Sequence, residues 1–257
     1  MPRLAANLSM LFPELAFLER FAAARAAGFH YVEYQFPYAH PPEAIARHAR
    51  AAGVQVVLHN LPAGDMARGE RGIACLPGRE REFRDSVERA IEYAKAVGCP
   101  RLNCLAGLAP QSRPHFDVLV DNVRAAARCL GEVGIELVIE PINTRTVPGF
   151  FLATSAQAID VLNAAGEGNA RLQYDVFHMQ IMQGDLARTI ERLLARIGHV
   201  QIADVPERHE PGTGEINFDF LLRHLDAIGY SGWVGCEYNP SGDTLEGLKW
   251  AKQYLSP

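Results

Sequence analysis

The chain has 257 residues, of which 48% are hydrophobic and 21% are charged, with a formal net charge of −5. This composition is typical of a soluble globular protein, and the length suits one large domain with a sizeable core. The negative charge argues against a nucleic-acid-binding surface, which needs clustered Lys and Arg. Because the sequence contains no run of about 18 apolar residues, we expect no membrane span.

The first residues, Met1 to Asn7, lead straight into a strand-like segment and show no apolar stretch of the kind found in signal peptides. Its cysteines are odd in number and form no C-x-x-C pair, which favours reduced thiols in the core. We therefore expect a cytoplasmic protein. The five cysteines are Cys75, Cys99, Cys104, Cys129 and Cys236.

Short apolar runs alternate with amphipathic segments along the whole chain, and a glycine follows almost every amphipathic segment. This pattern predicts strands that alternate with helices. The strands are expected at residues 4–9, 31–35, 54–58, 101–105, 135–140, 171–176, 199–203 and 233–237. The helices are expected at residues 14–27, 42–52, 79–97, 116–133, 155–165, 185–197, 218–228 and 244–255, with a long polar loop at 61–77.

Alternating strands and helices of this length imply a parallel sheet, and eight repeats favour closure into a single (β/α)8 barrel. A doubly wound open sheet is the alternative. That fold would usually carry a Gly-rich, phosphate-binding first turn, and the first predicted turn, at Asn7 to Met10, contains no glycine. We therefore predict an α/β protein with one barrel domain over residues 1–257.

Polar side chains end or nearly end the last four predicted strands. In a parallel barrel the C-terminal ends of all strands lie on one rim, so these side chains should converge. They are three carboxylates and one amide, and a divalent cation is the simplest way to keep converging carboxylates ionised. An all-oxygen set suits Mg²⁺ or Mn²⁺ better than Zn²⁺. The four residues are Glu140, Asp175, Gln201 and Glu237.

Each of these residues also has an ordinary structural interpretation. Glu140 and Glu237 could be charges that face a loop, and Asp175 could cap a helix. Gln201 is the weakest candidate alone, because an amide inside a strand often satisfies a neighbouring backbone group. The shared position at strand ends is what favours function.

Several stretches are long enough to indicate a family. They are NLSMLF at residues 7–12, HNLPAGD at 59–65, GERGIAC at 69–75, IEPIN at 139–143, QYD at 173–175, QIAD at 201–204, EPGTGEI at 210–216 and GWVGCEY at 232–238. The sequence resembles the hydroxypyruvate isomerase family, which belongs to the xylose isomerase-like TIM barrels together with the ketose 3-epimerases. The resemblance covers nearly the whole chain.

The resemblance implies that Glu140, Asp175, Gln201 and Glu237 coordinate one divalent metal ion. It also implies that Glu140 and Glu237 form the proton-transfer pair of an aldose-ketose isomerase that converts hydroxypyruvate to tartronate semialdehyde through an enediolate. In the epimerase relatives a His commonly stands at the position of Gln201. The all-oxygen set of this chain favours Mg²⁺, with Mn²⁺ as the alternative.

Four further residues are candidates for holding the substrate. His59 and His178 lie at or just beyond strand ends on the predicted rim, and either could hydrogen-bond a substrate oxygen or play a structural role. Arg208 follows the seventh strand and could hold a substrate carboxylate. Arg71 lies in the long loop, which could form a lid, and is a second candidate for the carboxylate.

Other activities on the same barrel stay open. A 2-oxo-tetronate isomerase or a ketose 3-epimerase would use the same site, and an inosose-type dehydratase would eliminate water there. A phosphodiesterase acting on damaged DNA would need more His ligands and a basic surface, which the sequence lacks. We expect a small hydroxy-oxo acid or sugar-like substrate, no nucleic acid and no membrane partner, and the family permits a homo-oligomer.

Overall fold

Eight parallel strands close into a barrel in the computed structural model, which describes residues 2–255. Each strand pairs with its neighbours in the sequence, and β1 pairs with β8 to close the ring. The strands are β1 (Arg3–Asn7), β2 (Tyr31–Tyr34), β3 (Gln55–Asn60), β4 (Arg101–Cys104), β5 (Glu136–Ile139), β6 (Ala170–Asp175), β7 (Ile197–Ile202) and β8 (Trp233–Cys236). The predicted (β/α)8 barrel is confirmed.

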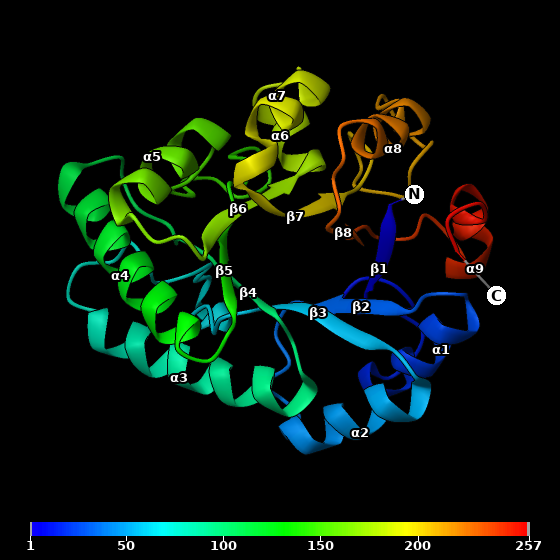
Figure 1. The fold of residues 1–257 in the computed structure, drawn as a ribbon, viewed down its shortest axis with the longest axis horizontal. Helices are drawn as coiled ribbons and strands as arrows, with labels where there is room; N and C mark the ends of the chain where they lie inside the picture. The colour runs from blue at the N-terminus through cyan, green and yellow to red at the C-terminus, as the bar shows by residue number, and fades with distance from the viewer. Residues whose placement is uncertain (1, 256–257) are drawn as a thin grey trace.

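Helices connect the strands and cover the outside of the barrel (Figure 1). Helix α2 follows the local rules from which it was predicted, with Pro42 in its first turn and Gly53 in the left-handed conformation at its end (φ 68°). The helices are α1 (Arg20–Ala26), α2 (Pro42–Ala52), α3 (Glu80–Val97), α4 (Arg113–Gly131), α5 (Ser155–Ala165), α6 (Val176–Met182), α7 (Leu186–Leu193), α8 (Phe218–Ala227) and α9 (Thr244–Gly247). Short 3-10 turns are η1 (Phe17–Glu19), η2 (Met66–Arg68), η3 (Leu194–Arg196) and η4 (Leu248–Ala251).

Several helices differ from the prediction, and the helix expected at residues 14–27 is shorter, consisting of η1 followed by α1. Helix α6 starts directly after β6 because the Asp175 side chain accepts hydrogen bonds from the backbone N–H groups of Phe177 and His178 (2.7 and 3.2 Å). The sequence predicted strand and loop there, since the cap residue is also the strand end. The helix expected at residues 244–255 is shorter, consisting of α9 followed by η4.

Successive residues of a strand point to opposite faces, so the barrel has two layers of buried side chains. One layer fills the barrel interior, and the other lies between the strands and the helices. Tyr34 points outward and packs against Phe17 and Phe21 of the first helical segment. Its neighbour Glu33 is fully buried and hydrogen-bonds to side chains of other strands across the barrel interior. The interior of this barrel is therefore partly polar, and its polar residues lie below the rim that carries the site.

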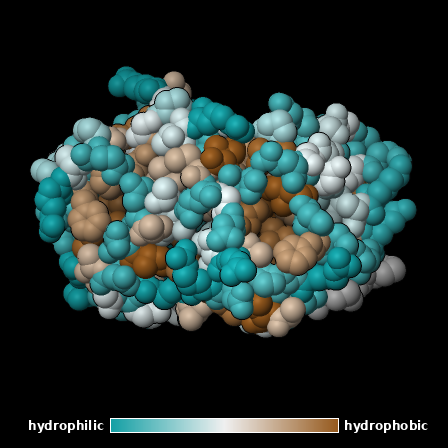
Figure 2. All heavy atoms as spheres, turned by 90° about the horizontal axis from the view of Figure 1, so that it is seen from above, coloured by the Kyte–Doolittle hydropathy of each residue, from teal (hydrophilic) through white to brown (hydrophobic). Residues whose placement is uncertain are grey.

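On the face shown in Figure 2, hydrophobic side chains occur in separate patches between hydrophilic ones. The described cysteines are free thiols, and four of the five are buried. Within residues 2–255, no helix combines the length and the apolar character that crossing a bilayer requires.

Candidate active site

A cavity of about 170 Å³ opens at the C-terminal ends of the strands, where barrel active sites are built. This volume is smaller than the ~300–1,000 Å³ of pockets for drug-sized ligands, which favours a small molecule. Glu140, directly after β5, and Glu237, directly after β8, both line the cavity. His178 and Arg208 line it as well, together with Arg71 from the long loop after β3.

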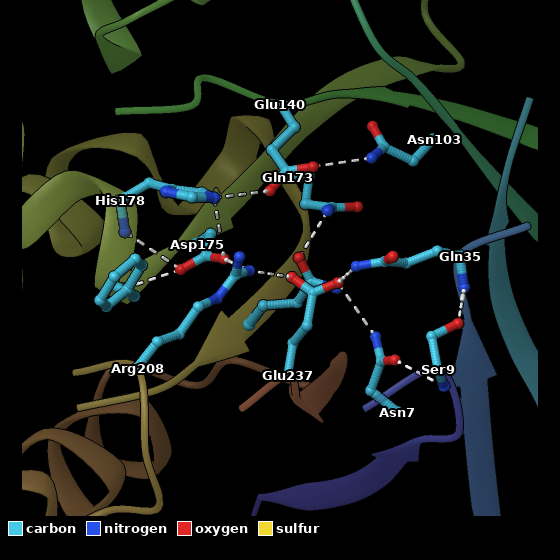
Figure 3. A network of polar contacts seen from close by, with 12 residues as sticks. Asn7, Ser9, Gln35, Asn103, Glu140, Gln173, Asp175, His178, Arg208 and Glu237 are labelled. Atoms are coloured by element: carbon cyan, nitrogen blue, oxygen red, sulfur yellow. Dashed lines mark hydrogen bonds and ion pairs between the residues drawn. The ribbon is translucent and has the colours of Figure 1, made fainter. Parts of the chain in front are cut away.

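Glu237 is held by three side chains. Oε1 accepts hydrogen bonds from Gln35 Nε2 at 2.9 Å and from Asn7 Nδ2 at 3.1 Å. Oε2 accepts from a guanidinium nitrogen of Arg208 at 2.7 Å. Figure 3 shows these donors arranged around the carboxylate, so its orientation is fixed from both sides.

Glu140 lies across the cavity and has fewer donors. Asn103 Nδ2 donates to its Oε2 at 2.8 Å, while Oε1 faces His178 Nε2 at 3.7 Å. His178 Nε2 is also 3.7 Å from Oδ2 of Asp175. One ligand atom from each of Glu140, Asp175 and His178 lies within 4.8 Å of the others, and all three residues are buried. This spacing is compatible with a single metal ion.

Glu140 and Glu237 are buried on the same cavity, and this shifts the pKa values of both side chains. Burial raises the pKa of Glu140 well above its usual range, and the charges of Glu237 and Asp175 raise it further. Burial also raises the pKa of Glu237, to about 7, although Arg208 opposes the shift. Burial lowers the pKa of His178 to about 4, so this ring is neutral at pH 7. Shifted carboxylates on a cavity are typical of acid–base sites.

Arg208 supplies the positive charge. Its guanidinium lies between Glu237 and Asp175, 2.7 and 3.4 Å from their oxygens, and only 23% of the side chain is exposed (Figure 3). Burial would lower the pKa of Arg208, but Glu237, Asp175 and Glu140 together raise it, so the residue stays charged. Its backbone is left-handed (φ 60°), which is uncommon for a residue with a Cβ and often marks a functional position.

Asp175 serves two purposes. Its Oδ1 caps helix α6, as the ordinary structural interpretation of this residue predicted. Its Oδ2 remains directed at His178 and Arg208 on the rim. Capping and a role in the site are therefore not alternatives for Asp175.

Gln201 lies on β7 opposite Asp175, and its amide contacts residues deeper in the barrel. Its Nε2 donates to Glu33 at 2.7 Å and its Oε1 accepts from Gln173 Nε2 at 2.6 Å. The oxygen still has a second lone pair. A metal bond from Gln201 stays a prediction.

The structure corrects the expected position of His59. Its ring stacks on Tyr34 (centroids 5.8 Å apart) in the layer between strands and helices, so the side chain points away from the barrel interior. The next residue, Asn60, lines the cavity instead. Strand alternation explains the difference, because neighbouring residues point to opposite faces. Arg71 does reach the cavity, where it donates to the backbone carbonyl of Glu70 at 2.7 Å.

Several polar residues of the site were not anticipated from the sequence. Gln35 and Asn60 follow or end neighbouring strands on the same rim, so the rule that selected Glu140 could have selected them. Asn103, inside β4, gave no signal of that kind. Asn143 follows β5 by several residues, and its Nδ2 lies 2.6 Å from His178 Nδ1.

Residues 21–254 match the family model described as xylose isomerase-like TIM barrel. The hydroxypyruvate isomerase of Escherichia coli (strain K12) is 49% identical, an alignment that covers 99% of this chain and 100% of that protein. The 2-oxo-tetronate isomerase of Cupriavidus necator is 46% identical and covers 99% of each. A crystal structure described as AP endonuclease, family 2, from Brucella melitensis has a TM-score of 0.98 at 45% identity, with 100% of both chains covered.

The match to the family model spans most of the chain, and the alignments to both isomerases run over its full length. The chain therefore belongs to the xylose isomerase-like TIM barrels and, within them, to the hydroxypyruvate isomerase family.

Proposed function

We propose that this protein is a metal-dependent isomerase that converts hydroxypyruvate to tartronate semialdehyde, acting as one domain. The observation that carries the proposal is a pair of buried glutamates, Glu140 and Glu237, on one small cavity with a cationic side chain beside them. Full-length similarity to isomerases of small hydroxy-oxo acids supports the same reaction class.

The reaction moves one proton between adjacent carbons. A carboxylate takes a proton from C3 of hydroxypyruvate, the hydroxyl proton passes from the C3 oxygen to the C2 oxygen, and a carboxylic acid returns a proton to C2. The pKa of Glu237, raised to about 7, suits this exchange, because a group that titrates near pH 7 can both accept and donate a proton. The pKa of Glu140 is raised well above its usual range, which suits the protonated partner of the pair. The two glutamates follow β5 and β8, which are three strands apart around the barrel.

The donor set fits a divalent cation. Glu140, Asp175 and Glu237 are all buried, and the charges of Glu237 and Asp175 act on Glu140, so an opposite charge there would be favourable. Gln201 would add a neutral oxygen, and an all-oxygen set favours Mg²⁺, with Mn²⁺ as the alternative. When bound, the ion would stabilise the negative charge that develops on the two substrate oxygens.

Two cationic or donor groups would hold the acid. Arg208 presents a guanidinium to the cavity, and guanidinium groups bind carboxylates in a bidentate manner. His178 is neutral and faces Glu140 and Asp175, where a substrate oxygen would lie within reach of its Nε2. Arg71 and Met66 from the loop after β3 line the cavity, where they would exclude water.

A four-carbon 2-oxo acid is the second candidate substrate, because a 2-oxo-tetronate isomerase is 46% identical over the same length. The cavity lining includes apolar side chains, among them Ile142 and Val147, besides its polar ones. Epimerisation of a ketose or elimination of water would use the same glutamates but give different products.

The test is an NMR assay of hydroxypyruvate in D₂O with Mg²⁺, with Mn²⁺ and with EDTA. We expect tartronate semialdehyde with deuterium at C2 only when a metal is present, and a loss of about 10²–10⁴-fold in rate for Glu237→Gln. Glu92→Gln, on the exposed side of α3, is the control and should match the natural protein. The four-carbon acid, a ketose and a DNA duplex with an abasic site complete the substrate panel. Turnover of any of these with none of hydroxypyruvate would replace the proposed substrate.

A further inference from the structure

Below the rim, the barrel interior holds a fully buried carboxylate, that of Glu33 on β2. Glu33 precedes Gln35 by two residues, so both point into the barrel and Glu33 lies one layer deeper than the cavity. No role in the reaction follows from this depth, since Gln35 and not Glu33 contacts Glu237. The question is what a buried charge does there.

Three donors surround the Glu33 carboxylate. Oε1 accepts from Asn7 Nδ2 at 3.0 Å and from Gln201 Nε2 at 2.7 Å. Oε2 is 2.6 Å from Nε2 of His199, which is also fully buried. With donors on both oxygens, the carboxylate acts only as an acceptor, so the atom of Gln201 that faces it must be the NH₂ group.

This contact sets which end of the Gln201 amide faces which way. A carboxamide carries its donor and its acceptor on one rigid plane, and pinning the nitrogen at Glu33 turns the oxygen toward β6. There Oε1 accepts a single hydrogen bond, from Gln173 Nε2 at 2.6 Å, and keeps one lone pair free. A flipped amide would present N–H groups, which cannot bind a cation.

The barrel makes room for this carboxylate at one glycine. A Cβ built on Gly235 of β8 would overlap both carboxylate oxygens of Glu33. Gly235 pairs with Gln201 in the sheet, so the space lies beside the amide that Glu33 holds. Glycine at this position thus permits the Glu33–Gln201 contact.

We propose that Glu33 is a positioning residue that fixes the amide of Gln201 with its oxygen available as a metal ligand. The inference rests on the proposed metal-dependent function. It adds that Glu33 makes Gln201, the fourth proposed ligand, present its oxygen rather than its nitrogen to the metal. Glu33 is not among the residues that line the cavity.

The test measures binding of Mn²⁺ alone, by calorimetry and by EPR of the free ion, with no substrate present. Glu33→Met keeps the size and removes the acceptor, and we expect the Kd for Mn²⁺ to rise about 10–100-fold. Glu33→Gln should restore most of the affinity, because its carbonyl oxygen can accept from Gln201 while its NH₂ group faces the His199 ring. If charge rather than orientation were the cause, Glu33→Gln would be as weak as Glu33→Met, and the proposal would fail.

A double-mutant cycle identifies the route of the effect. In a Gln201→Ala background, Glu33→Met should cause no further loss of affinity, whereas an equal further loss would overturn a role through Gln201. Gly235→Ala, which displaces the carboxylate without deleting it, provides a second variant in case Glu33→Met does not fold. Glu136→Gln, near the opposite end of the barrel in β5, is the matched control and should bind Mn²⁺ normally. If the natural protein binds neither Mn²⁺ nor Mg²⁺, the proposed metal-dependent function is overturned. If Glu33→Met binds Mn²⁺ normally, only the positioning role of Glu33 is overturned.

Discussion

Asn143 determines which nitrogen of His178 carries the proton. Oδ1 of Asn143 accepts from the backbone N–H groups of Arg145 and Thr146 (3.1 and 2.8 Å), so its NH₂ group must be the atom 2.6 Å from His178 Nδ1. Nδ1 is then an acceptor, and in the neutral ring the hydrogen lies on Nε2, which faces the cavity. This arrangement favours His178 as a donor to substrate over His178 as a metal ligand.

The first prediction follows from that hydrogen bond. Asn143→Asp replaces the donor by an acceptor and should move the ring proton of His178 to Nδ1, removing the N–H donor that faces the cavity. We expect kcat/KM to fall about 10–100-fold, as for loss of one hydrogen bond worth ~1–3 kcal/mol. The ¹⁵N chemical shifts of the imidazole report the tautomer directly. A natural protein with its proton on Nδ1 would contradict the assignment, whatever the variant does.

The second prediction concerns the charge of Arg208 in the metal-free protein. Arg208→Met leaves Asp175 and Glu237 without the guanidinium that offsets their charge, and breaking a mostly buried ion pair costs about 3 kcal/mol of unfolding free energy. Urea unfolding in EDTA measures this loss. Added Mg²⁺ should stabilise the variant more than the natural protein, because the cation replaces the missing charge.

Arg113→Met is the control for Arg208→Met. Arg113 pairs with Asp117 on the surface of α4, and 81% of its side chain is exposed. Water screens such pairs, so this substitution should leave stability almost unchanged. If the two variants have the same free energy of unfolding, the ion pairs of Arg208 contribute no more to stability than an exposed ion pair does.

The third prediction is a pH dependence of stability in the absence of metal. Burial holds the pKa of Glu237 at about 7, above its ordinary value of 4.5, so the native state binds a proton that the unfolded state releases. The contribution of Glu237 to the free energy of unfolding is therefore fully present below pH 4.5 and is lost as the pH rises to 7. The shift corresponds to about 3 kcal/mol. Glu237→Gln should flatten the profile between pH 5 and 8, measured by urea unfolding in EDTA, and an unchanged slope would assign the effect elsewhere.

The sequence located much of the site because parallel strands end on one rim. Glu140 and Glu237 line the cavity, and Asp175 lies on the rim beside them, as strand ends should. The same rule failed for His59, since the run from Gln55 to Asn60 is buried after its first residue and has no polar–apolar alternation to show which side chains point inward. The sequence predicted where this strand lies, but it did not predict which of its side chains point into the barrel.

The sequence did not predict contacts between residues that are far apart in the chain. Glu33 and His199 are 166 residues apart and become partners only when the barrel closes. His199 received no role in the sequence interpretation, because a His inside a strand has many ordinary explanations. Asn143 is similar, since its importance depends on the orientation of a ring on α6, a helix that the sequence did not predict.

The last prediction concerns the loop that carries Arg208. The buried carboxylate of Asp204 accepts hydrogen bonds from four backbone N–H groups of this loop, at Val205, Gly212, Gly214 and Ile216 (2.9–3.1 Å). The Asp204 carboxylate therefore organises this loop. Asp204→Asn turns one acceptor oxygen into an NH₂ group, so about 3 kcal/mol of stability should be lost with the charge-assisted bonds. Because the loop positions Arg208, KM for the acid should rise more than kcat falls.

Asp219→Asn, exposed on α8, is the matched control. Equal urea midpoints for the two variants would mean that the loop is held by other contacts, and amide hydrogen exchange at Gly212 and Gly214 would then stay slow in Asp204→Asn.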